Sequence, residues 1–531
     1  MSAQFEEAEA HERAGRAEAA IHAYEEALRI EGNTSAAINA AVLYKHQGKL
    51  GRARKLLLEA MTMDPVLRIS AGRLLNGGHI FGDSECTTSV LHQAAHVLTD
   101  VLTSAEYGSR AVRQRLGMRV YTGMSLLELR DNVELRAVLR ADRQGCLLLL
   151  FAMGAALPRV DVTSVLGAET TSRLIDHGLL LDCDTPWELV ASPVQVYPLS
   201  VRGDEEDTDD DAAVDDVLLC TDYDFESMLA PKFAVMPIGW DSLNLVRLAP
   251  HLCRKSVPTL LDLCCGSGVQ ALLALANELA DSVVAVDISA RAVRFTTFNA
   301  QLNGSARFAS RLTVLVGDVY SSLPAASCPF DAILANPPFV AVPRLRDLDA
   351  AGATVHAEWA LYADGGGDGA DVLRSIVTGA RDGGWLRAGG TMAIVTEIPN
   401  IRSAAIWMLD IPPEQSVARA AAGCGARRGI ALAIVWNPRH AQEAKRYAAE
   451  RSSERSWPWA SVAAWEASMR AHGVDHMSSG LILAVQLDDG APASGISRPM
   501  DGGSGSEGAA LLETAEAGVR DACDHLLNSG R

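Results

Sequence analysis

The chain has 531 residues, of which 48% are hydrophobic and 21% charged, so it can form large buried cores and has the length of three or four domains. Its longest apolar run, Cys146–Leu157, is too short to cross a bilayer, which argues against a membrane protein. The net charge is −19, and −10 remains without the nine acids of Asp204–Asp216, which weighs against a protein that binds nucleic acid through charge alone.

The cysteine pattern and the first residues indicate where the protein works. Ten cysteines are scattered along the chain without any Cys-x-x-Cys pair. This distribution is typical of a reducing compartment and argues against a disulfide framework or a zinc site, so we expect no metal. The first residues show no basic stretch followed by an apolar one. We therefore expect a cytoplasmic protein with no membrane partner.

Residues 1–66 contain a repeated helical pattern. Gly15–Leu28 aligns with Gly48–Met61 at an offset of 33 residues, and small residues recur at positions 20, 27, 53 and 60, where they would let helices pack closely. The pattern resembles tetratricopeptide repeats, whose usual period is 34, although a generic pair of helical hairpins shares these features. The resemblance implies a protein partner. Two repeats are fewer than such arrays need alone, so we expect them to pack against the following residues.

Residues 70–202 are expected to form a second unit, built from helices and one hairpin. A long helix is predicted over Ala111–Leu139. Three short helices are then predicted, at Leu147–Leu157, Thr163–Gly167 and Glu169–His177. Apolar residues on both sides of Asp182–Pro186 predict a hairpin across that turn.

Short helices followed by a hairpin suggest a winged helix, a module that can recognise nucleic acid. The presumed recognition helix, however, offers only Arg173 against Glu169 and Asp176, and the turn of the hairpin is acidic. A structural or substrate-positioning role is therefore favoured for this winged-helix-like α+β module.

Two segments are predicted to lie between or beyond the folded units. Residues 203–217 are rich in acids and are expected to form a solvated linker. Residues 488–531 form a low-complexity tail, in which Ala491–Gly508 is rich in Gly, Ser and Pro and is expected to be disordered. Ala509–Asn528 has the spacing of an amphipathic terminal helix.

The most informative region, within residues 218–487, begins as a strand, a tight turn and a helix. Pro258–Leu261 is a short apolar run that ends at Asp262, and it leads through Gly266 and Gly268 into the helical pattern Val269–Leu275. Glycines allow the backbone to pass close to a ligand, and the start of the helix offers free N–H groups. Two further strands end on acids, which would meet at one edge of a parallel sheet. They are Ser282–Val286 before Asp287 and Leu312–Val316 before Asp318.

Two nucleotide-binding alternatives fit this turn poorly. A P-loop ends in Gly-Lys-Ser or Gly-Lys-Thr, and no lysine occurs between Lys255 and Lys445. The dinucleotide fingerprint requires three spaced glycines, and Cys264 occupies the position of the first.

The turn instead resembles that of the class I S-adenosylmethionine-dependent methyltransferases. The resemblance implies an α/β chain whose Rossmann-like sheet binds S-adenosyl-L-methionine. It implies that Asp262 and Gly266 face the methionine portion, Asp287 the ribose and Asp318 the adenine amine. It also assigns to the cofactor site Cys264, Gly268, Ile288, Val319 and Asn336.

A fourth predicted strand, Phe330–Ala335, is followed by the sequence Asn336-Pro337-Pro338-Phe339. Consecutive prolines fix φ and remove N–H donors, so the carbonyl groups of this turn would be rigid acceptors. The side-chain oxygen of Asn336 is another acceptor. Two fixed acceptors could hold a planar NH₂ group with its lone pair facing a methyl donor, while Phe339 stacks on the flat group. Catalysis would then consist mainly of positioning.

This turn matches the Asn-Pro-Pro-aromatic motif of amino- and amide-N-methyltransferases. The later stretch Tyr362–Gly369 and the strand Met392–Glu397 resemble the HemK/PrmC protein-glutamine methyltransferases. From residue 100 to 487 the order of elements, including Gly239–Ser242 and a late strand at Gly480–Val485, resembles bacterial two-part winged-helix and methyltransferase proteins.

The resemblance implies an N-methyltransferase that acts on a planar NH₂, with a protein glutamine amide favoured. An RNA or DNA base amine remains the alternative acceptor, which would have to be flipped out of a duplex. A scaffold with an inactive methyltransferase fold is the alternative of another class. The expected catalytic residues are Asn336, Pro337, Pro338 and Phe339.

Overall fold

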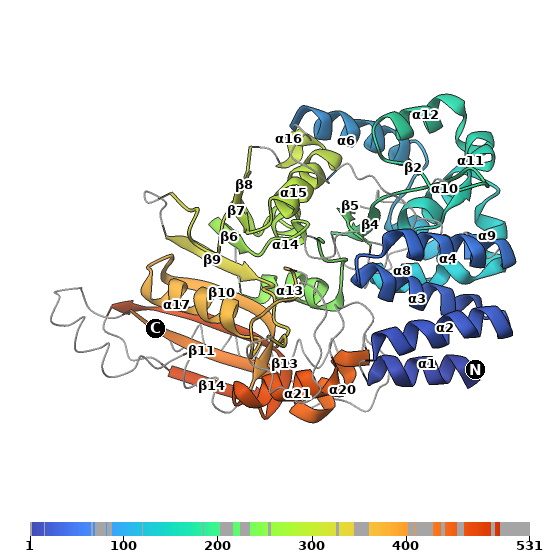
Figure 1. Ribbon diagram of the computed structural model, residues 1–531. Coiled ribbons are helices and arrows are strands. Elements are labelled where there is room, and N and C mark those ends of the chain that lie inside the picture. The colour runs from blue at the N-terminus through green and yellow to red at the C-terminus, as the bar shows by residue number, and fades with distance from the viewer. Residues whose placement is uncertain are drawn as a thin grey trace.

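The computed structural model describes residues 3–14, 16–64, 67–68, 81, 88–118, 121–183, 185–201, 216–223, 234–252, 256–308, 310–324, 329–344, 361–401, 408, 428–436, 441–453, 461–489 and 494–499. Figure 1 shows a stack of N-terminal helices in blue, a region of short helices beside it, and a twisted sheet flanked by helices. In the part of the chain so described, no helix is both long and apolar enough to cross a membrane.

The N-terminal repeats form four helices that pack in sequence order. They are α1 (Ala3–Arg13), α2 (Ala17–Glu31), α3 (Thr34–His46) and α4 (Leu50–Met63). The starts of α2 and α4 are 33 residues apart, which is the offset predicted from the sequence. The four small residues of the repeat, at positions 20, 27, 53 and 60, are all buried between the helices. Gly32 ends α2 in the left-handed conformation at φ 65°, where glycine meets no steric penalty.

The long helix predicted over Ala111–Leu139 is wrong, because the chain there is divided into short helices. They are α7 (Ser109–Leu116), α8 (Gly123–Glu128), a 3₁₀ turn (Leu129–Asp131) and α9 (Val133–Leu139), preceded by α6 (Thr88–Thr103). Gly117 ends α7 at φ 69°, while Thr122 and Asn132 start α8 and α9 by accepting backbone N–H groups with their side chains. These local caps override the apolar periodicity that joins the segments in the sequence.

The predicted short helices and hairpin are present, with changed bounds and one additional strand. The first helix begins earlier than predicted, as α10 (Arg143–Leu147), and continues as a π-helical turn (Leu148–Ala152). The rest of the unit consists of β1 (Leu157–Pro158), α11 (Arg159–Leu166), α12 (Ala168–Asp176), β2 (Leu181–Asp182) and β3 (Leu189–Ala191). Strand β1, which was not predicted, pairs with β3 to give an antiparallel sheet of order β1-β3-β2.

The turn between β2 and β3 contacts the N-terminal helices. Trp187 in this turn packs against their buried cluster, together with Ile38 and Leu58. The guanidinium of Arg68, just after α4, lies 4.3 Å from the centre of the Trp187 ring. The repeats are therefore attached to the hairpin of the second unit, as the shortness of the array led us to expect.

A two-stranded ribbon connects the second unit to the large sheet. It pairs β4 (Gln195–Ser200) with β5 (Asp216–Thr221) in antiparallel fashion. The predicted acidic linker 203–217 is thus too long at its end, because Asp216 already belongs to a strand and accepts hydrogen bonds from the backbone and hydroxyl of Ser109. Residues 203–215 of that prediction lie outside the described residues.

The large sheet has the order β14-β11-β13-β10-β9-β6-β7-β8. Its strands are β6 (Val257–Leu263), β7 (Ala280–Asp287), β8 (Leu312–Val316), β9 (Phe330–Ala335), β10 (Leu386–Pro399), β11 (Arg428–Trp436), β13 (His476–Asp489) and β14 (Ser494–Pro499), while the short β12 (Gln442–Glu443) pairs with β13. Strands β10, β9, β6, β7 and β8 are mutually parallel, and β13 is antiparallel to β10 and β11. The four strands predicted between 258 and 335 are confirmed.

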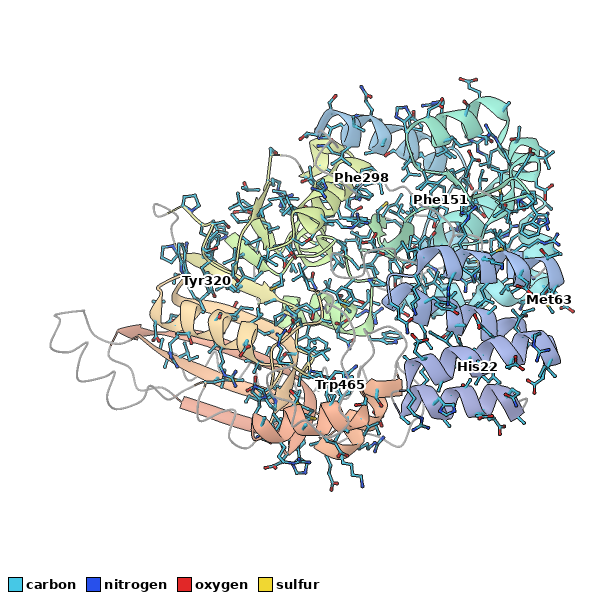
Figure 2. All side chains as sticks on the ribbon, in the orientation of Figure 1. His22, Met63, Phe151, Phe298, Tyr320 and Trp465 are labelled. Carbon is cyan, nitrogen blue, oxygen red and sulfur yellow. The ribbon has the colours of Figure 1, made fainter. Side chains whose placement is uncertain are left out.

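Helices cover both faces of this sheet. Alternate residues of the strands pack on α14 (Val269–Ala276) and α15 (Ala290–Leu302) on one face, and on α17 (Asp371–Asp382) on the other. The remaining helices are α13 (Trp240–Leu252), α16 (Ser305–Phe308), α20 (Ala444–Ser453) and α21 (Val462–Ala471). Figure 2 shows Phe298 on α15 and Trp465 on α21, both of which are fully buried.

The predicted disorder of Ala491–Gly508 is wrong for its first part. Residues Ser494–Pro499 form β14, which pairs in parallel with β11. The other edge of β11 pairs with β13, so β14 uses backbone groups of β11 that no other described strand satisfies. The predicted helix Ala509–Asn528 lies outside the described residues.

Replacing Trp187 with Ala should loosen the attachment of the repeats. Loss of the packed ring and its contact with Arg68 should cost about 1–3 kcal/mol at this interface. We expect backbone amides of α3 and α4 to exchange with deuterium several times faster, while the large sheet is unaffected. Val160→Ala is the matched control, because Val160 lies on α11 of the same unit and is 71% exposed. Equal exchange in the two variants would contradict the attachment.

Candidate functional site

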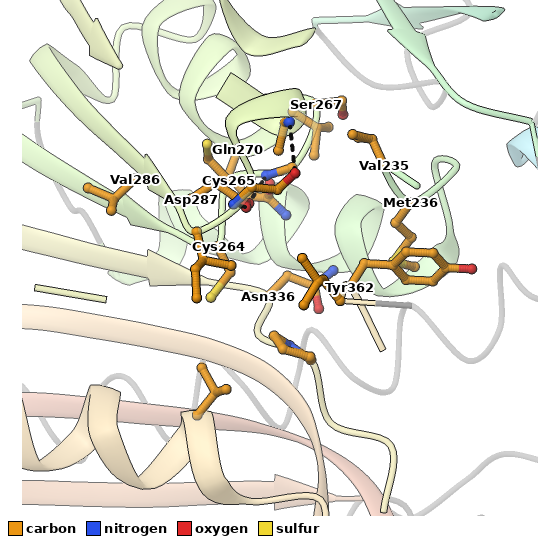
Figure 3. Close-up of a pocket in the computed structure, with 18 of the residues that line it drawn as sticks. Val235, Met236, Cys264, Cys265, Ser267, Gln270, Val286, Asp287, Asn336 and Tyr362 are labelled. Atoms are coloured by element: carbon orange, nitrogen blue, oxygen red, sulfur yellow. Dashed lines mark hydrogen bonds between the residues drawn. The ribbon is translucent and has the colours of Figure 1, made fainter. Parts of the chain in front are cut away.

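A cavity opens at the carboxyl ends of the parallel strands β6, β7, β8 and β9. The residues that line it come from the turns after these four strands, from the segment before α13 and from the segment before α17. They are Ala234, Val235, Met236, Ile238, Ser242, Cys264, Cys265, Gly266, Ser267, Val269, Gln270, Val286, Asp287, Ile288, Ser289, Ala292, Gly317, Asp318, Val319, Asn336, Pro338, Leu361, Tyr362, Asp364 and Val372. Figure 3 shows Asp287 and Asn336 on walls of this one cavity.

The turn after β6 adopts left-handed backbone conformations. Cys264, Gly266 and Gly268 have φ values of 59°, 54° and 81°. Two features of Gly268 exclude a side chain. Its φ is positive, and a Cβ would lie 2.7 Å from the Thr296 side chain on α15. Gly268 starts α14 and does not line the cavity, so its role is to allow close packing of turn and helix.

Asp262 lies beneath the turn and does not line the cavity, contrary to the direct contact implied by resemblance. Its side chain is fully buried, and one carboxylate oxygen accepts the Ala271 N–H of α14 at 3.0 Å. Burial raises the pKa of Asp262 well above its ordinary value, and the charge of Asp287 acts in the same direction. Asp262 therefore supports the turn by holding the first turn of α14.

Asp287, at the end of β7, connects the turn after β6 to the start of α15. One of its oxygens accepts the Gly266 N–H at 2.9 Å and the other accepts the Ser289 N–H at 2.8 Å, at the start of α15. Burial raises the pKa of this carboxyl, and the two N–H groups oppose the shift. Each carboxylate oxygen can accept a further hydrogen bond, so Asp287 remains able to bind hydroxyl groups.

The turn after β8 supplies the next part of the wall. Asp318 and Val319 both line the cavity, and the backbone N–H of Asp318 donates to the Ser321 hydroxyl at 2.9 Å. Ile288, which follows Asp287, is 56% exposed and lines the cavity as well. Acidic and apolar surfaces thus adjoin here, which suits a ligand with a flat ring and polar substituents.

Only two of the four predicted catalytic residues in the turn after β9 line the cavity. Asn336 and Pro338 line the cavity, whereas Pro337 and Phe339 do not. Phe339 packs instead against a buried cluster that includes Tyr447 and Trp465, from α20 and α21. The predicted stacking of Phe339 on a bound flat group is therefore not what the structure indicates. Tyr362 is the aromatic residue that lines the cavity, and Figure 3 shows it near Asn336 and Met236.

The side chain of Asn336 is held by the start of α13. Its amino group donates to the Asp241 carboxylate at 3.0 Å and to the Ser242 hydroxyl at 3.1 Å. From the sequence alone, Gly239–Ser242 is only part of a resemblance and has no expected role in the site. Nothing in the local sequence links residues 241 and 336, because 95 positions separate them.

The segment before α13 was also missed, together with Gln270 and Asp364. Val235, Met236 and Ile238 line the cavity from this segment. It is fixed by Asp222, a fully buried residue just after β5, whose carboxylate accepts the Val235 N–H at 2.8 Å. The sequence of this apolar segment contains no pattern that indicates a binding site. Only the folded structure shows that it lines the cavity.

A buried ion pair connects Asp222 to α15. The Arg291 guanidinium donates to both oxygens of Asp222, at 3.0 and 2.5 Å, and to the carbonyl of Phe81 at 2.8 Å. Both side chains are nearly or fully buried, so neither charge is compensated by water. The pair holds the Val235 segment against the helix that carries Ala292, on the opposite wall of the cavity.

No group of three or more His, Cys, Asp or Glu side chains that could hold a metal ion occurs among the residues with described positions. The cavity itself is acidic. Asp287, Asp318 and Asp364 line it, and no Lys, Arg or His stands among the lining residues described. Such a surface favours a ligand with positive charge and disfavours phosphate groups.

Comparison with known proteins agrees with this geometry. Residues 246–366 match the family model "Methyltransferase small domain". The chain is 35% identical over 186 residues to a ribosomal protein uL3 glutamine methyltransferase from Burkholderia pseudomallei, covering 34% of this chain and 56% of the relative. It is 39% identical over 132 residues to a release factor glutamine methyltransferase from Moorella thermoacetica, covering 24% and 43%.

A second release factor glutamine methyltransferase, from Mycolicibacterium smegmatis, is 29% identical over 266 residues, covering 48% of this chain and 83% of the relative. The chain spans about half the length of the first two relatives. The family match over residues 246–366 and the parallel strand order with its carboxyl-end cavity together indicate a Rossmann-like class I methyltransferase fold around the large sheet.

Replacing Arg291 with Met should destabilise the region around the cavity by about 3–5 kcal/mol, because it leaves the Asp222 charge buried without its partner. Urea unfolding followed by fluorescence measures the loss. The double variant Asp222→Asn/Arg291→Met should recover part of it, since neither charge then remains. Additive losses in the double variant would show that the pair acts through separate contacts.

Proposed function

We propose that this chain is an S-adenosylmethionine-dependent N-methyltransferase that acts on a planar NH₂ group, with a protein glutamine amide as the favoured acceptor. The observation that carries the proposal is that one cavity holds both Asp287, with free acceptor capacity, and Asn336, on the turn after the fourth parallel strand. The first residue suits a ribose and the second an amide.

The residues present fit S-adenosyl-L-methionine. The Asp287 carboxylate would accept both ribose hydroxyls, and Asp318 would accept the adenine amine. Ile288 and Val319 would cover the faces of the ring. The methionine portion would lie beside Gly266, which lines the cavity and where a Cβ would meet no atom within 4 Å. When bound, this cofactor supplies an electrophilic methyl group on a positively charged sulfur. The carboxylates of Asp287 and Asp318 favour that charge, whereas Asp364 already pairs with Arg344 at 2.5 Å.

The protein's part in the reaction would be to hold the acceptor. The Asn336 side-chain oxygen and a carbonyl of the Pro337–Pro338 turn would each accept one N–H of the NH₂ group, which leaves its lone pair facing the methyl donor. Tyr362 takes over the role expected of Phe339, as the aromatic surface beside the flat group. Methyl transfer would form the new nitrogen–carbon bond as the methyl carbon leaves the sulfur, which keeps the electron pair, and the methylated nitrogen would then lose a proton to water. No general base is therefore required.

Several observations support a protein acceptor over a nucleic acid base. The relatives reported above are named for ribosomal protein uL3 and for release factors. The acidic lining would repel phosphates. On α12, the presumed recognition helix, Arg173 pairs with Asp100 at 3.3 Å, and Trp187 of the hairpin turn packs on the repeats.

These contacts also support a structural role for the second unit. We assign residues 70–202 as a winged-helix-like module that joins the repeats to the methyltransferase domain, which begins at 218 and ends near 487. Residues 1–66 would form tetratricopeptide-like repeats that bind a protein partner, and residues 203–217 and 488–531 would connect and follow these units.

Asp287→Ala should weaken S-adenosylmethionine binding by about 1.5–3 kcal/mol, the contribution of hydrogen bonds to a charged group. Isothermal calorimetry measures the affinity, and circular dichroism checks that the fold survives. Asp281→Ala is the matched control, because Asp281 lies at the other end of the same strand and faces solvent. Equal affinity in the two variants would remove Asp287 from the cofactor site.

The proposed reaction can be tested with purified ribosomal protein uL3 and a bacterial release factor as acceptors and [methyl-³H]-S-adenosylmethionine as donor. We expect protease-sensitive label at glutamine in one of them. Asn336→Ala should lower turnover by about 10²- to 10³-fold, as the loss of one positioned group does elsewhere, with cofactor affinity nearly unchanged. Label that is released by nuclease from cell extract, with none in protein, would instead establish a nucleic acid acceptor.

A further inference from the structure

The Asn336 side chain can face the cavity in two ways, with opposite consequences. A carboxamide has an oxygen that only accepts hydrogen bonds and an amino group that donates two. An acceptor NH₂ of the substrate also donates two. The substrate can therefore bind only if the oxygen of Asn336 faces it, and a rotation of the amide by half a turn would bring two sets of donors together.

The structure uses the Asn336 amino group elsewhere. It donates to Asp241 at 3.0 Å and to Ser242 at 3.1 Å, both in the first turn of α13. These two hydrogen bonds occupy both N–H groups. Because the oxygen lies on the opposite branch of the planar amide, it is left as the branch available to the cavity.

Asp241 is the group that distinguishes the two orientations. A carboxylate can only accept, whereas the Ser242 hydroxyl can donate or accept and would tolerate either orientation. The second oxygen of Asp241 accepts the Ser242 N–H at 2.8 Å, which fixes the carboxylate at the start of the helix. Burial raises the pKa of the Asp241 carboxyl, while the hydrogen bonds from the Asn336 amino group and the Ser242 N–H oppose this shift and favour the ionised form.

The backbone at Gly239 lies close to the Asp241 carboxylate. A Cβ at Gly239 would lie 2.6 Å from one of its oxygens, so a larger residue there would displace it. Ser242 is 6% exposed and lines the cavity, while Asp241 does not line it. Asp241 thus touches Asn336 from behind the cavity wall.

We propose that Asp241 is a positioning residue that locks the Asn336 amide with its oxygen toward the substrate. The proposal rests on the N-methyltransferase function proposed above. It adds the residue that makes Asn336 present a hydrogen-bond acceptor, and not a donor, to the substrate. It implies that the site selects acceptors that donate hydrogen bonds, such as NH₂ groups, and rejects carboxylates and carbonyl oxygens.

Exchange of the two side chains provides a sharp test. Asp241→Asn keeps the size but presents either an amino group or an oxygen, so the lock is lost. Asn336→Asp keeps an acceptor in the cavity but places two carboxylates about 3 Å apart. The double variant Asp241→Asn/Asn336→Asp restores one donor and one acceptor at the contact and again leaves an oxygen facing the cavity.

Each variant is assayed for kcat and KM with whichever of ribosomal protein uL3 and the release factor the wild-type protein methylates, for S-adenosylmethionine affinity by calorimetry and for thermal unfolding. We expect Asp241→Asn to lower kcat by about 10- to 100-fold, the effect of one hydrogen bond to a charged group, with cofactor affinity within about twofold of wild type. The exchanged double variant should be at least about tenfold more active than Asn336→Asp alone. Asp281→Asn, an exposed position at the start of β7, controls for the loss of one acid.

A merely structural role for Asp241 makes different predictions. It would lower kcat equally in the wild-type and Asn336→Ala backgrounds, whereas the lock requires no further loss in Asn336→Ala. Additive losses, a fully active Asp241→Asn or a double variant no better than Asn336→Asp would each overturn the proposal. If Asp241→Asn does not fold, the comparison of Asn336→Asp with the double variant decides. Absence of methyl transfer by the wild-type protein would instead contradict the proposed function, and the lock with it.

Discussion

The register of four parallel strands is the constraint on which the site depends. Leu263 at the end of β6 lies opposite Val286 of β7 and Ala335 of β9. The next residues of the three strands are Cys264, Asp287 and Asn336, so one register brings the turn, the acid and the amide to the same edge. A shift of one residue in β9 would turn Asn336 to the other face of the sheet and exchange the buried residues of that strand between the cores on its two faces.

This constraint explains which features the sequence could predict. Strands β8 and β9 were predicted with the bounds that the structure shows, because each is a short apolar run that ends at a turn. The cavity edge followed from the parallel order. The direction in which each side chain points could not be predicted from the strand order. Asp262 and Phe339 were expected to face a ligand, and both point into packed regions, since alternation and the helices behind each strand decide this.

Contacts between distant segments account for most of what the sequence could not reveal. Asp241 and Asn336 lie 95 residues apart, and Asp222 and Arg291 lie 69 apart. A pattern within either segment contains no information about the other. At 111–139 the prediction failed for a different reason, which is local capping. Gly117 ends one helix, and Thr122 and Asn132 each start another, inside an otherwise continuous apolar pattern.

Phe81 shows that the boundary between the units is not where composition changes. Its ring stacks on Phe295 of α15 with centroids 3.9 Å apart, and its carbonyl accepts hydrogen bonds from both Arg291 and Arg294. A residue of the second unit, which precedes α6 in the chain, is thus part of the core of the last unit. The methyltransferase part is therefore not an independent segment of the chain. A fragment that starts at residue 218 would leave two arginines without their shared acceptor and an aromatic surface open to water, whereas a fragment that starts before Phe81 would keep both.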